Sequence, residues 1–286
     1  HTLNGTTSSC AGNRYGSTAY EPGSGTSILA YAGICASQNI QSNSDPFFHT
    51  ASYDEILSFS VDGPGNDCAT ITSTTNNPPT VDAGAGSFTI PINTPFTLNG
   101  SGADPDGDDL TFSWEQFDLG PAGAPNDPEG NAPLFRSFSP KDTSARTFPD
   151  IADIISNNQT LGEILPSYSR SLSFRLTARD NKNGGGGVNY DEISFEVTEE
   201  AGPFLVNSFN TSTALTAQSN VTITWDVANT DNAEVNCQSV NILLSTDGGL
   251  TYPTSLAENI PNNGTSTILI PYIQSTTARL KVEAAD

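Results

Sequence analysis

Acidic side chains crowd into one short segment of the chain. Asp104, Asp106 and Asp108 alternate around Gly107, and Asp109 follows directly. Carboxylates gathered by a glycine turn suit a hard cation such as Ca²⁺, which takes about six to eight oxygen ligands. An aspartate-rich turn without metal is the alternative, because aspartate side chains also bond their own backbone in turns. The sequence predicts a calcium site of weak to moderate affinity formed by Asp104, Asp106 and Asp108.

Catalytic groups of other kinds are scarce. The chain has two histidines, His1 and His49. It contains no H-E-x-x-H motif, which would place two zinc ligands one helical turn apart, and no G-x-S-x-G elbow of a serine hydrolase. Residues 184–187 are all glycine but lack the Lys-Ser/Thr ending of a phosphate-binding loop, so they predict a flexible hairpin loop. We therefore expect no complete catalytic set in this chain.

The charge of the chain argues against two classes of partner. Its 32 acidic and 10 basic residues give a formal net charge of −22 at pH 7. A surface this negative repels the phosphates of nucleic acids and anionic lipid headgroups. No run of residues approaches the ~20 apolar side chains that a membrane-spanning helix needs. We expect no nucleic-acid partner and no insertion into a membrane.

Composition divides the chain into three regions. Residues 1–70 are rich in glycine and serine, and their pattern predicts one short helix that is capped by Ser52. Apolar residues alternate with polar ones in 78–200 and again in 202–286. This period of two is typical of antiparallel sandwiches with one buried face and one face in water. An insertion at about 120–165 interrupts the alternation in the first of these regions.

The two alternating regions predict the fold class. Each has one tryptophan in the middle of a strand pattern, Trp114 and Trp225, as immunoglobulin-like sandwiches have in their cores. We expect a mainly β chain with two immunoglobulin-like modules, the second of them truncated, behind an irregular and partly helical N-terminal region. Within the insertion, residues 149–155 predict a helical turn.

The N-terminal region resembles a known family. The resemblance rests on segments 1–5 (HTLNG), 19–25 (AYEPGSG) and 27–35 (SILAYAGIC). They resemble the end of the catalytic domain of secreted reprolysin-like metzincins of Bacteroidetes type. In metzincins, H-E-x-x-H-x-x-G-x-x-H supplies three zinc ligands and a methionine turn lies beneath the metal. The string from Asp104 to Trp114 resembles the polycystic-kidney-disease or cadherin-like modules of secreted bacterial enzymes.

The resemblance implies roles for individual residues. His1 would be the third zinc ligand, Tyr31 a neighbour of the zinc, and Leu29 stands where the family has its methionine. A terminal residue without a role is the other interpretation of His1, and a packed loop aromatic that of Tyr31. The first two zinc ligands and the glutamate base are absent. Residues 1–70 would then be the C-terminal remnant of a catalytic domain whose N-terminal half is missing.

The resemblance implies that the chain is a fragment of a larger enzyme. The parent would be a secreted, extracellular bacterial zinc metalloendopeptidase that acts on protein or peptide substrates, with zinc as its cofactor and calcium in the module of residues 78–200. The β modules would bind substrate or a surface, and the chain alone would be inactive. The alternative from another class is a non-enzymatic secreted adhesin or calcium-binding β-module protein.

Cysteines are few and lie at 10, 35, 68 and 237. Cys10 and Cys35 bracket the Leu29 turn, and a disulfide between them would stabilise the fold by about 3 to 4 kcal/mol through the restricted unfolded chain. We expect Cys68 to pair outside this sequence.

Because residues 1–70 form no β-sheet of their own, we also expect them to be the least stable region.

Overall fold

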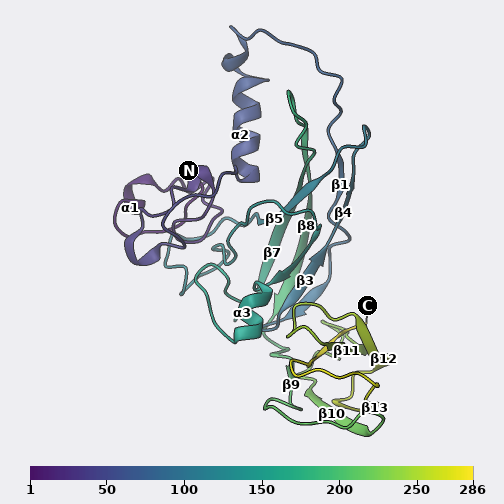
Figure 1. Ribbon diagram of the computed structural model, residues 1–286. Coiled ribbons are helices and arrows are strands. Elements are labelled where there is room, and N and C mark those ends of the chain that lie inside the picture. Colours follow the sequence, from purple (N-terminus) through teal and green to yellow (C-terminus); the bar gives the residue numbers. More distant parts are fainter. Residues whose placement is uncertain (286) are drawn as a thin grey trace.

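The computed structural model describes residues 1–285 and is mainly β (Figure 1). Two immunoglobulin-like sandwich modules follow a small, partly helical N-terminal region, so the expected mainly β class is confirmed. No helix among the described residues is long and apolar enough to cross a membrane.

Short helices and loops make up the N-terminal region. Helix α2 begins at Thr50, and His49 caps it because its Nδ1 accepts a hydrogen bond from the Ala51 N–H at 3.1 Å. The predicted cap at Ser52 is wrong: Ser52 is buried in the first turn. The helices are α1 (Cys10–Asn13), η1 (Ile28–Ala30), η2 (Ala36–Gln38), α2 (Thr50–Ser60) and η3 (Pro64–Asn66).

The first module is built on a four-stranded sheet with the order β2-β8-β7-β5, beside the pairs β1-β4 and β3-β6. Helix α3 (Ile151–Ser156) confirms the helical turn expected in the insertion. The strands are β1 (Thr80–Asp82), β2 (Thr89–Pro91), β3 (Phe96–Asn99), β4 (Ser101–Ala103), β5 (Thr111–Gln116), β6 (Ala145–Phe148), β7 (Arg170–Arg179) and β8 (Val188–Thr198).

Phenylalanine rings form the centre of this module. Phe174 on β7 is fully buried, and its ring centroid lies 4.8 Å from that of Phe148 and 6.0 Å from that of Phe195. Trp114 on β5 belongs to the same cluster and donates its Nε1–H to Ser144 O at 2.8 Å. The alternation seen in the sequence therefore places one face of β5, β7 and β8 in a shared core.

The second module is smaller. Its sheets have the orders β13-β10-β9 and β12-β11-β14, and Trp225 packs with Ile223, Val240 and Ile242. Its strands are β9 (Leu205–Val206), β10 (Asn220–Asp226), β11 (Ser239–Ser245), β12 (Thr254–Pro261), β13 (Thr265–Leu269) and β14 (Arg279–Ala284).

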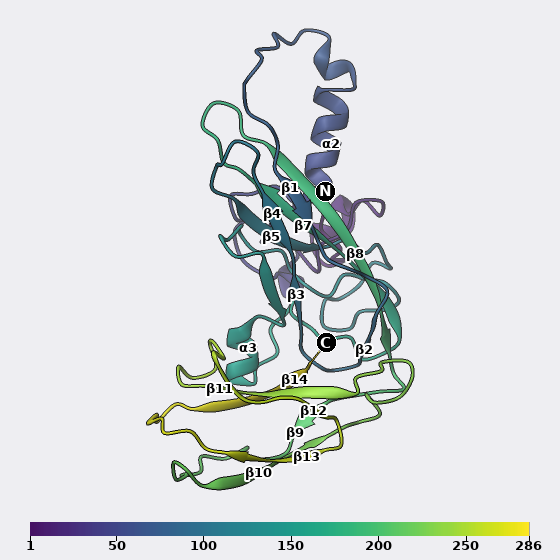
Figure 2. The ribbon, with the colours of Figure 1, turned by 90° about the vertical axis from the view of Figure 1, so that its right-hand side faces the viewer.

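The N-terminal region lies against the first module (Figures 1 and 2). It covers the sheet face that the alternation predicted to be in water, and that expectation is wrong for part of the sheet: Glu115 and Thr177 are fully buried. The insertion supplies further contacts. Asn4 and Arg14 donate to the carbonyls of Pro121 and Gly120 at 3.0 and 2.9 Å, and Thr26 donates to Ser137 O at 2.7 Å.

Candidate functional sites

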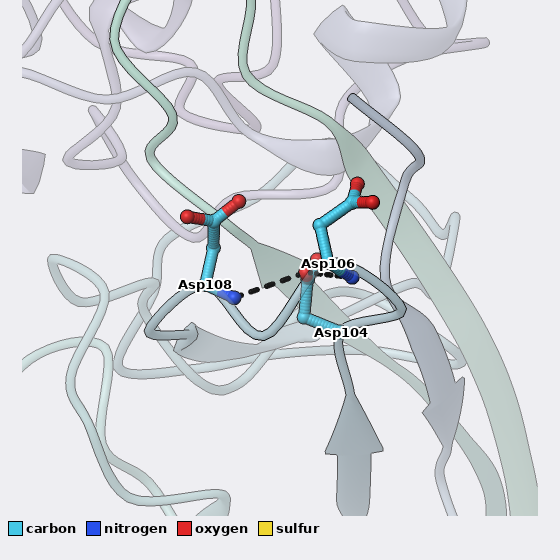
Figure 3. A group of neighbouring side chains, drawn as sticks. All are labelled: Asp104, Asp106 and Asp108. Carbon is cyan, nitrogen blue, oxygen red and sulfur yellow. Dashed lines mark hydrogen bonds between the residues drawn. The ribbon is translucent and has the colours of Figure 1, made fainter. Parts of the chain in front are cut away.

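The structure brings the three predicted cation ligands together. Asp104, Asp106 and Asp108 each offer one carboxylate oxygen, and these oxygens lie within 4.8 Å of one another. Asp104 organises the loop, because its Oδ1 accepts the N–H of Asp106 at 2.8 Å and of Asp108 at 3.1 Å (Figure 3). Gly107 takes a φ of 81°, which glycine adopts without strain.

Other groups of the chain already bond two of these carboxylates. The Asn77 N–H donates to Asp106 Oδ2 at 2.6 Å. The Lys182 ammonium donates to both oxygens of Asp108, at 2.7 and 2.9 Å, and the bond to Asp108 raises the pKa of Lys182. The remaining oxygen, Asp104 Oδ2, is buried and has no partner among the described residues. A divalent cation would therefore compete with an ammonium for this loop.

Two neighbouring aspartates do not join the loop. Asp180, on the turn after β7, accepts hydrogen bonds from the N–H of Gly187 at 2.8 Å and from Asn76 at 2.6 Å. Asp191 on β8 accepts the Ala83 N–H at 2.9 Å. Both carboxylates hold backbone segments in place, and the described cation group contains only Asp104, Asp106 and Asp108.

The loop is not an EF-hand, although Glu115 stands twelve positions into it. An EF-hand needs glycine at the sixth position and a glutamate free to bind the ion at the twelfth, and Asp109 occupies the sixth. Glu115 lies on β5, where it accepts the Thr50 N–H at 3.2 Å and the Thr177 hydroxyl at 2.9 Å. Glu115 thus binds the N-terminus of α2 and does not take part in the aspartate loop.

The residues with implied zinc roles lie next to one another. The rings of His1 and Tyr31 pack edge to face with centroids 4.5 Å apart. The Thr2 N–H donates to Leu29 O at 3.2 Å, which joins the first residues of the chain to the turn that carries Leu29 and Tyr31. Tyr31 has a left-handed backbone with φ of 63°, and this conformation ends η1 and turns the ring toward His1.

His1 alone does not make a zinc site. Its Nδ1 lies 2.8 Å from Asn13 O, a partner that fixes the ring and leaves Nε2 open, as in many metal-binding histidines. A catalytic zinc needs three protein ligands. The other histidine, His49, is buried and caps α2, and no histidine belongs to a cation group among the described residues. The residues present thus supply one of the three protein ligands that a catalytic zinc ion needs, and they do not form a zinc site by themselves.

Sequence reasoning missed a buried carboxylate that organises the N-terminal loops. Glu21 is fully buried. Its Oε1 accepts the N–H groups of Thr26 and Ser27 at 2.9 and 3.1 Å, and its Oε2 accepts the hydroxyls of Thr2 and Ser27. The sequence carries no periodic signal for such a residue, because its partners come from loops.

A second charged cluster joins α2 to the sheet. Arg175 on β7 bonds Asp54 of α2 and Glu192 of β8 at 2.5 and 2.6 Å. Its guanidinium lies over the rings of Phe117 and Tyr190, at 3.5 and 3.9 Å from their centroids. Together with Glu115, this arginine fixes the first turn of the helix while its far end projects from the body (Figure 1).

Cys10 and Cys35 are joined by a disulfide across 25 residues, beside the buried side chain of Leu3. Cys68 is exposed and forms no disulfide among the described residues.

Comparisons with known proteins identify no family. No protein-family model matches the chain, and no curated protein matches it. Among solved structures it is similar to the FN1–FN3 domains of chicken CNTN1, with 11% identity over 74% of this chain and 64% of that chain and a TM-score of 0.26. A structure of titin domains matches with 10% identity over 73% of this chain and 61% of that one, at a TM-score of 0.25. The chain spans less than two thirds of either structure.

Proposed function

We propose that the chain is the C-terminal portion of a secreted, zinc-dependent metalloendopeptidase. In this proposal His1 is the third zinc ligand, Leu29 lies at the methionine-turn position, and Tyr31 lies beside the metal. The observation that carries it is the edge-to-face contact of the His1 and Tyr31 rings at 4.5 Å. Segments 30 residues apart meet at this contact, which supports a shared role for His1 and Tyr31.

The environment of His1 supports the proposal. The imidazole has a backbone acceptor at Nδ1 and an open Nε2, and second partners of this kind fix the orientation of metal-binding histidines. The region that carries it is anchored by Glu21 and by the contacts of Asn4 and Arg14 with the insertion. The β modules would then hold the ligand-bearing segment and contact substrate or a surface.

The proposal predicts that residues 1–286 alone cleave no peptide. One imidazole cannot hold zinc or supply a base. The decisive experiment extends the chain toward its N-terminus with the residues that its gene encodes there, and measures zinc-dependent cleavage of casein. We expect an H-E-x-x-H segment within about ten residues of His1, activity that chelators remove, and loss of activity in His1→Ala.

A matched control is Asn13→Ala, which removes only the Asn13 side chain and keeps the backbone acceptor of His1. We expect this variant to stay active. An extended chain without H-E-x-x-H, or one whose cleavage survives His1→Ala, would refute the peptidase proposal.

A second candidate is a calcium-binding β-module protein without enzymatic activity. The observation that favours it is the gathering of three carboxylate oxygens within 4.8 Å. At a Ca²⁺ concentration fifty times Kd, binding should add about 2 kcal/mol to the stability of the first module. Thermal melting with Ca²⁺ and with chelator measures this gain. Asp106→Asn should remove it, whereas Asp109→Asn, in the same loop but outside the group, should keep it.

A further inference from the structure

Four asparagines of the chain are followed directly by glycine: Asn4, Asn99, Asn183 and Asn263. Asparagine is a thermolabile residue type, and a following glycine has no side chain to shield its backbone nitrogen. That nitrogen can attack the side-chain amide carbon and release ammonia. The attack needs a free glycine N–H, a free side-chain amide and a backbone that can move, and these conditions separate the four pairs.

In two of the pairs the attacking nitrogen is hydrogen-bonded. The Gly5 N–H donates to Gly23 O at 2.8 Å, and the Gly100 N–H donates to Ser144 O at 3.3 Å. The Asn4 side chain is also bonded at both its oxygen and its nitrogen. These bonds must open before either asparagine can react, so the folded chain protects both pairs.

The third pair is held by its neighbours in the turn between β12 and β13. Asn263 Oδ1 accepts the Thr265 N–H at 3.2 Å, which fixes the orientation of the side-chain amide. The Gly264 carbonyl accepts the Trp225 N–H at 3.0 Å, which fixes the glycine. This pair therefore cannot rearrange without local unfolding of the second module.

The fourth pair meets all three conditions. Asn183 and Gly184 are exposed in the loop between β7 and β8. Neither the Asn183 side chain nor the Gly184 N–H has a hydrogen-bond partner within residues 1–285. A Cβ placed on Gly184 would meet no neighbour within 4 Å, and further glycines at 185–187 add freedom to the loop.

We propose that Asn183 is a site of spontaneous deamidation in the folded chain. The Gly184 nitrogen forms a bond to Cγ of Asn183 and gives up its proton. The bond from Cγ to Nδ2 breaks, and Nδ2 takes up that proton and leaves as ammonia. Water then opens the resulting cyclic imide at one of its two carbonyls, which yields aspartate or isoaspartate at position 183.

The product changes the charge of a small pocket. Asn183 lines a pocket of about 200 Å³ together with Asn76, Asp106 and Lys182. Deamidation adds a carboxylate to this pocket, and isoaspartate also lengthens the backbone of the loop by one carbon. The reaction consumes only water and requires neither zinc nor calcium, so it takes place whether or not the functions proposed above hold.

Incubation of the folded chain at neutral and mildly alkaline pH, followed by mass spectrometry of chymotryptic peptides, tests the proposal. Asn183 should lose its amide about tenfold faster or more than Asn4, Asn99 and Asn263, because the other three react only after local opening. The reaction should accelerate as the pH rises, since the attacking nitrogen must lose its proton. Labelling with an isoaspartyl methyltransferase should detect the isoaspartate that forms.

The same chain unfolded in guanidinium is the matched control, in which all four pairs lose their protection and should react at similar rates. Asn183→Gln should abolish the methyltransferase signal of the folded chain, because glutamine would have to close a larger ring. Asn263→Gln should leave that signal unchanged. Equal rates at the four pairs in the folded chain, a faster reaction at another asparagine, or a signal that survives Asn183→Gln would each overturn the proposal.

Discussion

The N-terminal region and the first β module are held together by different kinds of core. The module buries a cluster of aromatic rings around Phe174. The buried apolar cluster of the N-terminal region consists only of Leu3 and the Cys10–Cys35 disulfide. In the same region the carboxylate of Glu21 accepts five hydrogen bonds from nearby loops. A chain segment without periodic apolar residues can therefore be ordered by buried polar groups that bond one another.

The aromatic core should give the largest effect. Phe174→Ala removes a fully buried ring from contact with Phe148 and Phe195, and should lower the free energy of unfolding by about 4 kcal/mol. Urea unfolding followed by tryptophan fluorescence measures this loss. Phe59→Ala, at a ring that is 62% exposed on α2, is the control and should change stability by less than about 0.5 kcal/mol. Similar losses of stability in both variants would show that the module does not depend on its aromatic core.

The disulfide should come next. Cys10→Ser combined with Cys35→Ser opens a loop of 25 residues and should cost about 3 kcal/mol, through the freedom gained by the unfolded chain. Limited proteolysis should then cut residues 1–70 faster than in the unsubstituted protein, while the first module stays intact. First cuts within 202–286, with 1–70 resistant even when reduced, would contradict this view of the N-terminal region.

Glu21→Ala tests the polar core directly. It leaves the Thr26 and Ser27 N–H groups buried without acceptors, which should cost about 2 kcal/mol. Amide exchange should accelerate in residues 1–40 and remain unchanged in β7. Glu21→Gln keeps one carbonyl acceptor and should cost less. Equal exchange rates in the parent and Glu21→Ala would mean that Glu21 does not organise these loops.

Glu163, in the insertion, gives an expected effect similar in size to that of Glu21, and this effect depends on pH. Burial raises the pKa of Glu163 to about 7, and the Arg146 guanidinium at 2.7 Å offsets only part of this. Because the folded pKa lies above the unfolded value of 4.5, the stabilisation is complete below pH 4.5 and is lost as the pH rises toward 7.

Stability of the first module should thus fall by about 2 kcal/mol between pH 5 and pH 7. Unfolding midpoints measured across this range test the prediction. Glu163→Gln, which cannot ionise, should show a flatter profile, and a parallel decline in both proteins would assign the pH dependence to other groups.

The strands of the first module could be predicted because their apolar residues alternate. Leu172, Phe174 and Leu176 on β7 are all fully buried, as a period of two requires. The opposite face was misjudged because polar residues such as Thr177 and Glu115 usually lie in water. Here Glu115 accepts the Thr50 N–H in the first turn of α2 and the hydroxyl of Thr177, a contact between distant segments that no local pattern encodes.

In the candidate sites, too, some contacts could be predicted from the sequence and others could not. The spacing of Asp104, Asp106 and Asp108 predicted their proximity, because a glycine turn needs only local geometry. The partner of Asp108 could not be predicted, because Lys182 lies 74 residues away on another loop. Glu21 gave no signal at all, because a single glutamate among glycines and serines is as typical of an exposed loop as of a buried one.

The N-terminal region is connected to the first module in two ways, by the peptide chain and by non-covalent contacts with the insertion and the sheet. The peptide linker that precedes the first module runs through largely exposed residues, from 67 to 79. Residues 1–66 nevertheless hold the module through Asn4, Arg14 and the anchored start of α2. A protease that cuts the linker would therefore produce two polypeptides that still migrate as one particle and part only in denaturant.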